Sequence, residues 1–563
     1  MNQYRQKYGI KWIFLKTKGT RIYLLILIIA GTMISVVNIG MTIILKTFVD
    51  IATGDSKENI LKITFFAISF LVLEGVLGVV TSITYRVSVN RIGKKMRIEM
   101  EKRFYDAKLL ELQQYHTGEL MTNVTIDVDK VCECIPNFIN STVGNALTCL
   151  FAVFYLFYLN WKLALILLIC IPFLIFCVAV FSPIVQRASK KDRENEEQVR
   201  VYFQEILEKI LILKMSSMRT IIQDKVTSLL NMKICSARNL GIAEGGSSFL
   251  NNVLGTSMFL IAIGGGAYFV TRGELVVGAM IAVVQLSNYI IWPFTAIGEI
   301  ISNVNQAIVS AKRLDRVYSM QAEEQRTELK NENKVLNCLA LQNISFCYGE
   351  ENLFHNITEK FCAGKIIGII GQSRCGKSTL LKIVSGLYEP SSGNVTLEFS
   401  DSSISDSIRS YVGLVPSENL IFQGTITENI CMAKKVDLAL LHQCVQMANL
   451  NKFISSLPDQ FETRIGGGSQ ALSSGQEQRL AIARVLYQGA NIVLFDEPTS
   501  NLDQESIKVF LKTLSVIRQN HLCIVVTHDK RVAAYCDQIY ELKNGNLSPC
   551  HLTEDSVLQL IDP

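Results

Sequence analysis

The stretch KIIGIIGQSRCGKSTLLKIV, residues 365–384, decides the fold of the C-terminal part of this chain. Residues 365–370 are largely apolar and predict a buried strand, and an apolar helical pattern begins at Leu380. Between them, residues 371–379 form a Gly-x-x-x-x-Gly-Lys-Ser-Thr loop. Backbone N–H groups of such a loop, together with the N-terminus of the helix, can surround phosphate oxygens. The sequence therefore predicts a phosphate-binding loop in an α/β domain.

Each residue of this loop is expected to lie at a bound nucleotide. We expect Lys377 to add a positive charge at the phosphates, and the Ser378 hydroxyl to ligate Mg²⁺. A nucleotide and Mg²⁺ are therefore the expected ligands of this loop. The predicted nucleotide-binding residues of the loop are Gly371, Gln372, Ser373, Arg374, Cys375, Gly376, Lys377, Ser378 and Thr379.

Six apolar runs precede this domain, and each has a length suited to the hydrocarbon core of a bilayer. They cover roughly residues 22–45, 60–83, 135–158, 163–181, 249–270 and 275–300. Lys and Arg are frequent in residues 1–21, 86–103 and 186–245, which places these segments in the cytoplasm. We therefore expect an integral, multi-pass protein of a bacterial plasma membrane with both termini in the cytoplasm.

The polar segment 312–334 marks the expected domain boundary, near residue 330. We expect residues 1–330 to form an all-α, six-helix transmembrane domain with long cytoplasmic helical extensions and a linker, and residues 331–563 an α/β P-loop nucleotide-binding domain. The net charge of +5 is small, and the basic residues lie beside apolar segments. This pattern argues for contact with membrane lipid and for no nucleic-acid partner. The fifteen cysteines lack paired spacing, so we expect mostly reduced thiols.

Two apolar strands in the second domain end in polar residues. Residues 492–495 lead to Asp496 and Glu497, and residues 522–526 lead to His528. We expect Asp496 to lie beside Mg²⁺, Glu497 to polarise an attacking water, and His528 to contact the γ-phosphate. The catalytic residues predicted are therefore Glu497 and His528.

This ordered set of motifs resembles the ATP-binding cassette (ABC) half-transporters of the exporter type. LSSGQ at residues 472–476 resembles the signature of that family, and SNLD at 500–503 resembles its D-loop. Tyr348 matches the aromatic residue that stacks on adenine, and HTGEL at 116–120 resembles the first cytoplasmic loop. The resemblance covers nearly the whole chain.

The resemblance implies an ATP hydrolase coupled to transmembrane transport. Two half-transporters would close head to tail over two ATP molecules, so that Ser473, Gly475 and Gln476 of one chain contact nucleotide on the other. Closure would turn the spans from inward-open to outward-open, since ATP contacts both cassettes only in the closed state. The implied function is the export of a lipophilic compound, a peptide or a lipid.

Three residues depart from the family pattern. Arg374 replaces a glycine of the phosphate loop, Ser417 replaces the glutamine that touches Mg²⁺, and Ser474 replaces the first signature glycine. Ser417 could still reach the metal through a bridging water. These departures make ATP binding a firmer expectation than fast hydrolysis.

Several alternatives follow from the departures. The chain could be the slow-hydrolysing regulatory half of a heterodimer, because an altered signature impairs only the partner's site. An uptake system built on the exporter fold is a further alternative. The sequence leaves open both the transported substrate and the choice between homodimer and heterodimer.

Overall fold

The computed structural model describes residues 2–216, 218–323, 335–349, 351–401, 403–405, 408–418, 421–432, 434–466, 472–500 and 502–550. The chain divides into two compact units. Unit 1 contains Met1–Tyr105 and Tyr115–Met320, and unit 2 contains Asp106–Gln114 and Gln321–Pro563. The chain therefore passes between the units at residues 105/106, 114/115 and 320/321.

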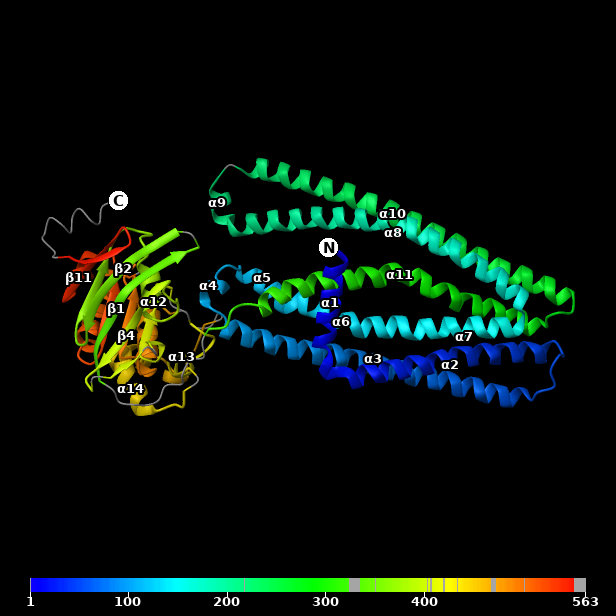
Figure 1. Ribbon diagram of the computed structural model, residues 1–563, viewed down its shortest axis with the longest axis horizontal. Coiled ribbons are helices and arrows are strands. Elements are labelled where there is room, and N and C mark those ends of the chain that lie inside the picture. Colours follow the sequence, from blue (N-terminus) through cyan, green and yellow to red (C-terminus); the bar gives the residue numbers. More distant parts are fainter. Residues whose placement is uncertain are drawn as a thin grey trace. The chain divides into compact units, whose positions relative to one another are not determined.

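Unit 1 consists of helices, several of which are much longer than a membrane is thick. Figure 1 shows α8 and α10 running side by side, joined through the short α9, and α11 lying along α7. Buried Leu, Val and Ala side chains from α7, α8, α10 and α11 form the largest apolar cluster of this unit. The helices are α1 (Asn2–Lys16), α2 (Arg21–Ala52), α3 (Ile60–Asp106), α5 (Thr117–Thr122), α6 (Val128–Phe138), α7 (Gly144–Leu159), α8 (Trp161–Glu208), α9 (Ile210–Met215), α10 (Arg219–Thr271) and α11 (Val277–Tyr318), with a 3₁₀ turn at Lys18–Thr20 and π-helical turns at Asn123–Asp127 and Ile139–Val143.

Four segments in the described part of unit 1 are long and apolar enough to cross a membrane. They are Lys18–Ala52, Ile60–Asp106, Thr117–Leu159 and Arg219–Thr271. The other two predicted spans begin with shorter apolar stretches, Trp161–Pro172 of α8 and Val277–Ile291 of α11. A membrane-spanning helical region is therefore confirmed, whereas the count of six spans stays a prediction.

The long cytoplasmic extensions predicted from charge are continuous with the apolar helices. Helix α3 runs for 47 residues from the second predicted span into the basic segment after Arg86. Helix α8 runs for 48 residues through Pro172 and Pro183. A proline removes one backbone hydrogen bond of a helix. Inside a membrane no water is present to bind the other backbone groups, so these keep their bonds within the helix and the helix continues past the proline.

Polar side chains hold two of the helix junctions in unit 1. The side chain of Asn160 accepts a hydrogen bond from the backbone N–H of Leu163 at 3.0 Å and caps α8. The carboxylate of the buried Asp50 accepts from the backbone N–H of Gly278, 3.1 Å away at the start of α11. A carboxylate at a helix N-terminus is favoured by the helix dipole, so Asp50 fixes the end of α2 against α11.

Unit 2 has an α/β fold with two main sheets. The antiparallel sheet has the order β2-β1-β4-β5, and the mainly parallel sheet has the order β12-β11-β3-β10-β9-β6. The strands are β1 (Leu336–Tyr348), β2 (Glu351–Cys362), β3 (Ile366–Ile370), β4 (Ser392–Phe399), β5 (Ile404–Ser405), β6 (Val412–Val415), β7 (Gly424–Thr425), β8 (Arg464–Ile465), β9 (Ile492–Asp496), β10 (Leu522–Val526), β11 (Gln538–Lys543) and β12 (Asn546–Pro549). The helices are α4 (Leu109–Leu112), α12 (Lys377–Val384), α13 (Ile426–Cys431), α14 (Leu438–Met447), α15 (Asn451–Ser455), α16 (Ser474–Tyr487), α17 (Gln504–Ile517) and α18 (Lys530–Ala533), with 3₁₀ turns at Ile408–Ser410 and Gln460–Glu462.

The parallel sheet lies between two apolar clusters because neighbouring residues of a strand point to opposite faces. On β9, Val493 and Phe495 join the cluster formed with α14, α16 and α17. Ile492 and Leu494 join the opposite cluster, which includes α12 and the antiparallel sheet. Both faces of the central strands are therefore buried, which explains their continuous apolar sequences.

Residues 106–114 interrupt unit 1 in sequence but pack in unit 2. Leu109 and Leu110 of α4 contact the apolar cluster of the antiparallel sheet. The backbone N–H of Lys108 donates to the carbonyl oxygen of Gln321 at 3.0 Å, and the N–H of Glu323 donates to that of Asp106 at 2.7 Å. This segment is therefore fastened to the start of the C-terminal unit by both apolar and backbone contacts.

Candidate functional site

The predicted site residues of unit 2 follow neighbouring parallel strands. The phosphate loop follows β3, His528 follows β10, Asp496 ends β9 with Glu497 next, and Ser417 follows β6. These four strands are adjacent and parallel in the order β3-β10-β9-β6. Ligands of open parallel sheets bind outside the carboxyl ends of the strands. The topology thus brings these segments to one edge of the sheet.

Two glycines give the phosphate loop its path. Gly376, with φ of +103°, precedes α12, and a Cβ there would lie 2.9 Å from a ring carbon of Phe354. A Cβ on Gly371 would lie 2.5 Å from the carbonyl oxygen of Leu542. Residues with side chains rarely fit such positions. The loop geometry therefore depends on the glycines from which it was predicted.

Lys377 and Ser378 begin α12 and face the loop and the strand beside it. The buried Lys377 donates from Nζ to the carbonyl oxygens of Gly371 and Gln372, both at 2.9 Å. The Ser378 hydroxyl donates to Oδ1 of Asp496 at 2.9 Å. Burial, and to a smaller extent the nearby charge of Glu497, raises the pKa of Asp496 above its usual range, although the Ser378 bond opposes this shift. A cation beside Asp496 would offset the cost of its charge.

Glu497 and His528 lie together beyond the ends of β9 and β10. Glu497 has a left-handed backbone with φ of +46°, and its N–H donates to the carbonyl oxygen of Val526 at 2.9 Å. Its Oε2 atom is 3.8 Å from Nδ1 of His528. Asp529 caps α18 and accepts hydrogen bonds from Arg531, which fixes the turn that follows His528. The strained backbone at Glu497 is typical of functional positions.

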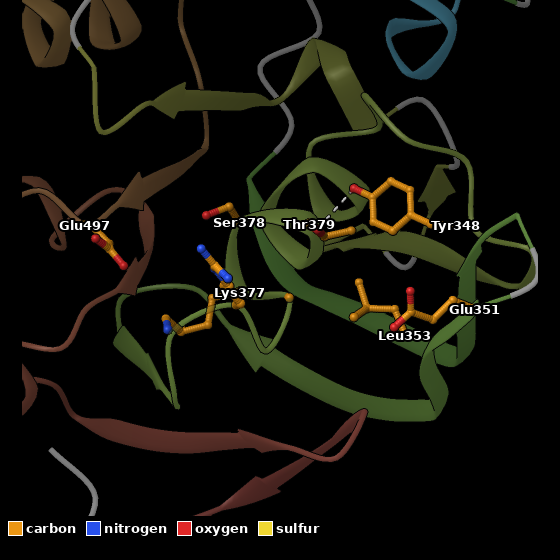
Figure 2. A pocket seen from close by; sticks show the side chains of 9 residues that line it. Tyr348, Glu351, Leu353, Lys377, Ser378, Thr379 and Glu497 are labelled. Atoms are coloured by element: carbon orange, nitrogen blue, oxygen red, sulfur yellow. Dashed lines mark hydrogen bonds between the residues drawn. The ribbon is translucent and has the colours of Figure 1, made fainter. Parts of the chain in front are cut away.

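A cavity of about 350 Å³ joins most of these groups. Figure 2 shows the Tyr348 ring at one end and Glu497 at the other, with Lys377, Ser378 and Thr379 between them. The Tyr348 hydroxyl lies 3.3 Å from that of Thr379. The remaining residues that line the cavity are Glu351, Leu353, Arg374 and Gly376. From one end to the other, the cavity is thus lined by an aromatic ring, a cationic loop and a carboxylate.

The other predicted loop residues surround this cavity more loosely. Gln372 and Ser373 are exposed in the loop, and Cys375 is partly buried against the apolar cluster of the antiparallel sheet. The backbone N–H of Cys375 donates to the carbonyl oxygen of Gln372 at 3.3 Å. Cys375 therefore packs as a small apolar residue.

Ser417 and the signature segment lie at a second cavity, of about 240 Å³. Ser417 and Ser474 line it together with Glu477, Pro498 and Ser500. Ser473 caps α16 through a reciprocal capping box with Gln476, and Gly475 is buried behind them. The structure therefore brings Ser417 to the signature segment of its own chain.

Four further residues lie at or near these cavities, and no sequence pattern predicted them: Gln478, Tyr388, Glu351 and Leu353. Gln478 of α16 donates from Nε2 to the carbonyl oxygen of Pro498 at 2.6 Å, which connects the signature helix to the segment after Glu497. The buried Tyr388 lies edge-on to Tyr348, with ring centroids 6.2 Å apart, and hydrogen-bonds to Gln113 beside α4. Glu351 and Leu353 line the first cavity from the start of β2. Local glycine and proline patterns do not predict these residues, because their positions at the cavities depend on contacts between segments that are distant in sequence.

Comparison with protein families gives the decisive observation. Residues 22–294 match the family model of the ABC transporter transmembrane region, and residues 354–500 match the ABC transporter family model. The chain belongs to the ABC transporter family. It joins a transmembrane region and an ATP-binding domain in one polypeptide, as the half-transporters of this family do. The transporter is thus an ATPase coupled to transmembrane transport and a multi-pass membrane protein.

Curated relatives align with this transporter, two of the three below over most of its length. An ATP-dependent lipid A-core flippase of Burkholderia orbicola is 23% identical over 90% of the chain and 86% of its own length. The alpha-hemolysin translocation ATP-binding protein of Escherichia coli O157:H7 is 26% identical over 88% of the chain and 70% of its own length. A probable ABC transporter ATP-binding/permease protein of Haemophilus influenzae is 32% identical over 47% of the chain and 48% of its own length. The transporter therefore resembles exporters of different cargo classes.

Proposed function

We propose that the transporter binds Mg²⁺·ATP in the Tyr348–Glu497 cavity and uses its hydrolysis to export cargo across a bacterial plasma membrane. The observation that carries this proposal is the convergence of the phosphate loop, Asp496, Glu497 and His528 at the carboxyl edge of three adjacent parallel strands. Positioning and charge stabilisation supply most of the catalysis in phosphoryl transfer, and this edge holds groups suited to both.

The order of groups in the cavity assigns their roles. The Tyr348 ring would stack on adenine, and residues 371–379 would surround the phosphates, with Lys377 turning from its loop carbonyls to the phosphate oxygens. Glu497 would orient and polarise the attacking water, and His528, 3.8 Å from Glu497, would contact the γ-phosphate. Arg374 lines the same cavity, so its guanidinium can contribute to phosphate binding.

The residues present also fit a magnesium ion. The Ser378 hydroxyl and the Asp496 carboxylate already face each other at 2.9 Å, and both are oxygen ligands of the kind that Mg²⁺ prefers. Ser417 would take part through a bridging water. When bound, the ion supplies positive charge to phosphate oxygens. The chain's own part is to hold an ionised Asp496 at the end of β9, against the cost of its burial.

A second half-transporter would complete each site. Ser473 and Ser474 are exposed at the N-terminus of α16, where backbone N–H groups and the helix dipole favour an anion. We propose that Ser473, Gly475 and Gln476 contact the γ-phosphate of a nucleotide held by the partner, either a second copy or a different chain. The side chain of Ser474 would limit this approach, which keeps the regulatory half of a heterodimer as an alternative.

The segment 106–114 connects unit 2, which holds the proposed nucleotide site, to the helices of unit 1 through the polypeptide chain. It packs in unit 2, while α3 enters it directly and α5 begins three residues after it. Tyr388 contacts both Tyr348 of the nucleotide cavity and Gln113 of this segment. We propose that this contact helps to transmit the nucleotide-bound state to the membrane helices. In the family pattern a glutamine serves this purpose, and Ser417, which replaces it, has a shorter side chain.

The relatives favour export over uptake, because one is named as a lipid A-core flippase and another as an alpha-hemolysin translocation protein. We propose a lipid as the first cargo to test, with lipophilic compounds and peptides as the other classes. Both termini would be cytoplasmic, because the basic residues before α2 and along α3 and α8 avoid translocation.

A lipid-transport assay tests the proposal. The full-length chain would be reconstituted in liposomes with a fluorescent phospholipid, with ATP supplied outside, and leaflet exchange would be followed by chemical quenching. We expect exchange that requires ATP and is lost in Glu497→Gln but kept in Glu505→Gln, a change at an exposed glutamate of α17. ATP hydrolysis without lipid exchange would direct the search to peptide or lipophilic cargo.

A further inference from the structure

The antiparallel sheet of unit 2 holds two thiols face to face. Cys338 of β1 and Cys362 of β2 are paired in the register of the strands, and their Sγ atoms lie 3.0 Å apart. Beside them the backbone N–H of Ala363 donates to the carbonyl oxygen of Asn337 at 2.9 Å. That bond marks Cys338–Cys362 as a non-hydrogen-bonded pair, the type in which facing Cα atoms approach most closely, to about 4.5 Å.

This position suits a disulfide. A disulfide needs Cα atoms about 4.4–6.8 Å apart and a bond of about 2 Å between the sulfurs. The strand register supplies the first requirement, and the sulfurs would have to approach by only about 1 Å to meet the second. Side-chain rotation can provide such a movement without a shift of either strand.

We propose that Cys338 and Cys362 are a reversible disulfide site that responds to peroxide. The Cys362 thiolate attacks one peroxide oxygen, the O–O bond breaks, and the products are a sulfenic acid on Cys362 and one water. The Cys338 sulfur then attacks the Cys362 sulfur, the S–S bond forms, and the sulfenic oxygen leaves as a second water. In total the two thiols lose two electrons and two protons, and one hydrogen peroxide becomes two waters.

Burial sets the order of the two steps. Cys362 is partly exposed, whereas Cys338 is 4% exposed on the central strand of the sheet. Burial, together with the hydrogen bond to Cys362, raises the pKa of the Cys338 thiol to about 11, although the Lys360 ammonium opposes this. Cys338 therefore reacts second: it is protonated until Cys362 is oxidised, and its proton passes to the departing sulfenic oxygen as its sulfur attacks Cys362.

The disulfide would join the open end of the β1–β2 hairpin. The other end of this hairpin carries Tyr348 and lines the nucleotide cavity with Glu351 and Leu353. Irregular register between Leu341 and Cys347 separates the two ends. We therefore expect oxidation to stabilise unit 2 while changing the affinity for ATP by less than about twofold, since bulges absorb small strand movements.

Mass spectrometry of the oxidised full-length chain tests the site. The purified protein would be treated with hydrogen peroxide, blocked with N-ethylmaleimide in denaturant, and digested. We expect the Cys338–Cys362 linked peptide at a yield at least about tenfold above that of the buried pair Cys431 and Cys444, and its loss on addition of a thiol reductant. If both cysteines still react with N-ethylmaleimide, or if Cys338 is linked elsewhere, the proposal is wrong.

Single substitutions test the order of attack. In Cys338→Ala the sulfenic acid on Cys362 should persist and react with dimedone, whereas Cys362→Ala should leave Cys338 unlabelled. Cys444→Ala should keep the Cys338–Cys362 link and serves as the matched control. Labelling of Cys338 in Cys362→Ala would overturn the assigned order. The measurement on the unsubstituted chain decides the proposal even if a variant fails to fold.

Discussion

Arg374 occupies a backbone position that suits glycine. Its φ of +67° is left-handed, which costs a residue with a side chain about 1–2 kcal/mol. Its guanidinium also lines the nucleotide cavity. The residue therefore combines backbone strain with a charge placed where phosphates are expected.

Two substitutions at Arg374 separate these effects. We expect Arg374→Gly to raise the apparent melting temperature of the ligand-free protein by about 2 °C through relief of strain. Arg374→Ala should give no such gain, and both should weaken ATP binding about tenfold because they remove the same charge. Thermal unfolding and titration with a fluorescent ATP analogue measure the two effects. Tighter ATP binding by Arg374→Gly would mean that the side chain crowds the loop instead.

Ionisation of the partly buried Asp496 carboxyl is unfavourable in the protein without a bound cation. Because burial raises the pKa of Asp496 above its ordinary value of 3.8, the folded protein favours the protonated carboxyl more than the unfolded chain does. Its contribution to stability is therefore highest below pH 3.8 and is lost as the pH rises through the raised pKa.

Asp496→Asn should remove this pH dependence. Without nucleotide, we expect the variant to melt at a higher temperature than the unsubstituted protein above that range, and to lose its dependence on Mg²⁺ for ATP binding. Melting curves between pH 4 and 8 measure the first effect, with Asp459→Asn on the exposed surface as control. Lower stability of Asp496→Asn at neutral pH would contradict this account of the site.

At the scale of single residues, chemistry confined to a short stretch was predictable. The spacing of the glycines and Lys377 predicted a loop between β3 and α12, and the apolar runs predicted that Asp496, Glu497 and His528 lie at strand ends. The roles assigned to these side chains stay predictions. The contacts of Tyr388, Gln478 and Gln113 were not predictable, because each joins segments that only the fold brings together.

Among the elements, the segment around α4 is fastened in unit 2 by several polar contacts. Arg409 donates to both carboxylate oxygens of Glu323 and to the carbonyl oxygen of Gly386, which anchors the chain just after the unit boundary. Lys108 pairs with Glu389 at 2.6 Å. Tyr388 adds its hydroxyl bond to Gln113 beside these pairs. Together these contacts hold residues 106–114 in unit 2.

Tyr388→Phe tests the contact between this segment and the nucleotide site. The change keeps the ring stacked on Phe346, with centroids 5.7 Å apart, but removes the hydroxyl bond to Gln113. A hydrogen bond of about 1 kcal/mol corresponds to a roughly fivefold faster exchange of the backbone amides of residues 106–114. Hydrogen-exchange mass spectrometry measures this rate, with Tyr535→Phe on the surface as control. Unchanged exchange would show that the hydroxyl does not hold the segment.

The sequence predicted the elements well where one physical pattern dominated. Strands β9 and β10 lie at the predicted apolar runs, because both faces of a central parallel strand are buried. Helix lengths were harder to predict, since α3 continues from an apolar into a charged segment without a break signal, and α8 does so despite Pro183. The π-helical turns at Asn123–Asp127 and Ile139–Val143 gave no sequence signal that we recognised.

Across the whole molecule, the chain passes between the units three times, at residues 105/106, 114/115 and 320/321. We expect a movement of unit 2 on ATP binding to act on the membrane helices through these connections, which lie at the end of α3, before α5 and after α11. ABC exporters generally work as dimers, and under the proposed function the exposed Ser473 and Ser474 of one half-transporter would face a nucleotide on the other. Whether the partner is identical decides how strongly Ser474 limits turnover.

ATP hydrolysis by the purified, lipid-reconstituted chain, alone and in Glu497→Gln, tests the central claim most directly. The account predicts that Glu497→Gln lowers turnover by about 10²–10⁴-fold, the usual loss for a residue that activates a nucleophilic water, while ATP binding persists. Glu505→Gln should retain normal turnover. Vigorous turnover by the chain alone would also exclude an obligatory different partner. Hydrolysis by Glu497→Gln at the rate of the unsubstituted chain would contradict the assignment of Glu497 and with it the account of the site.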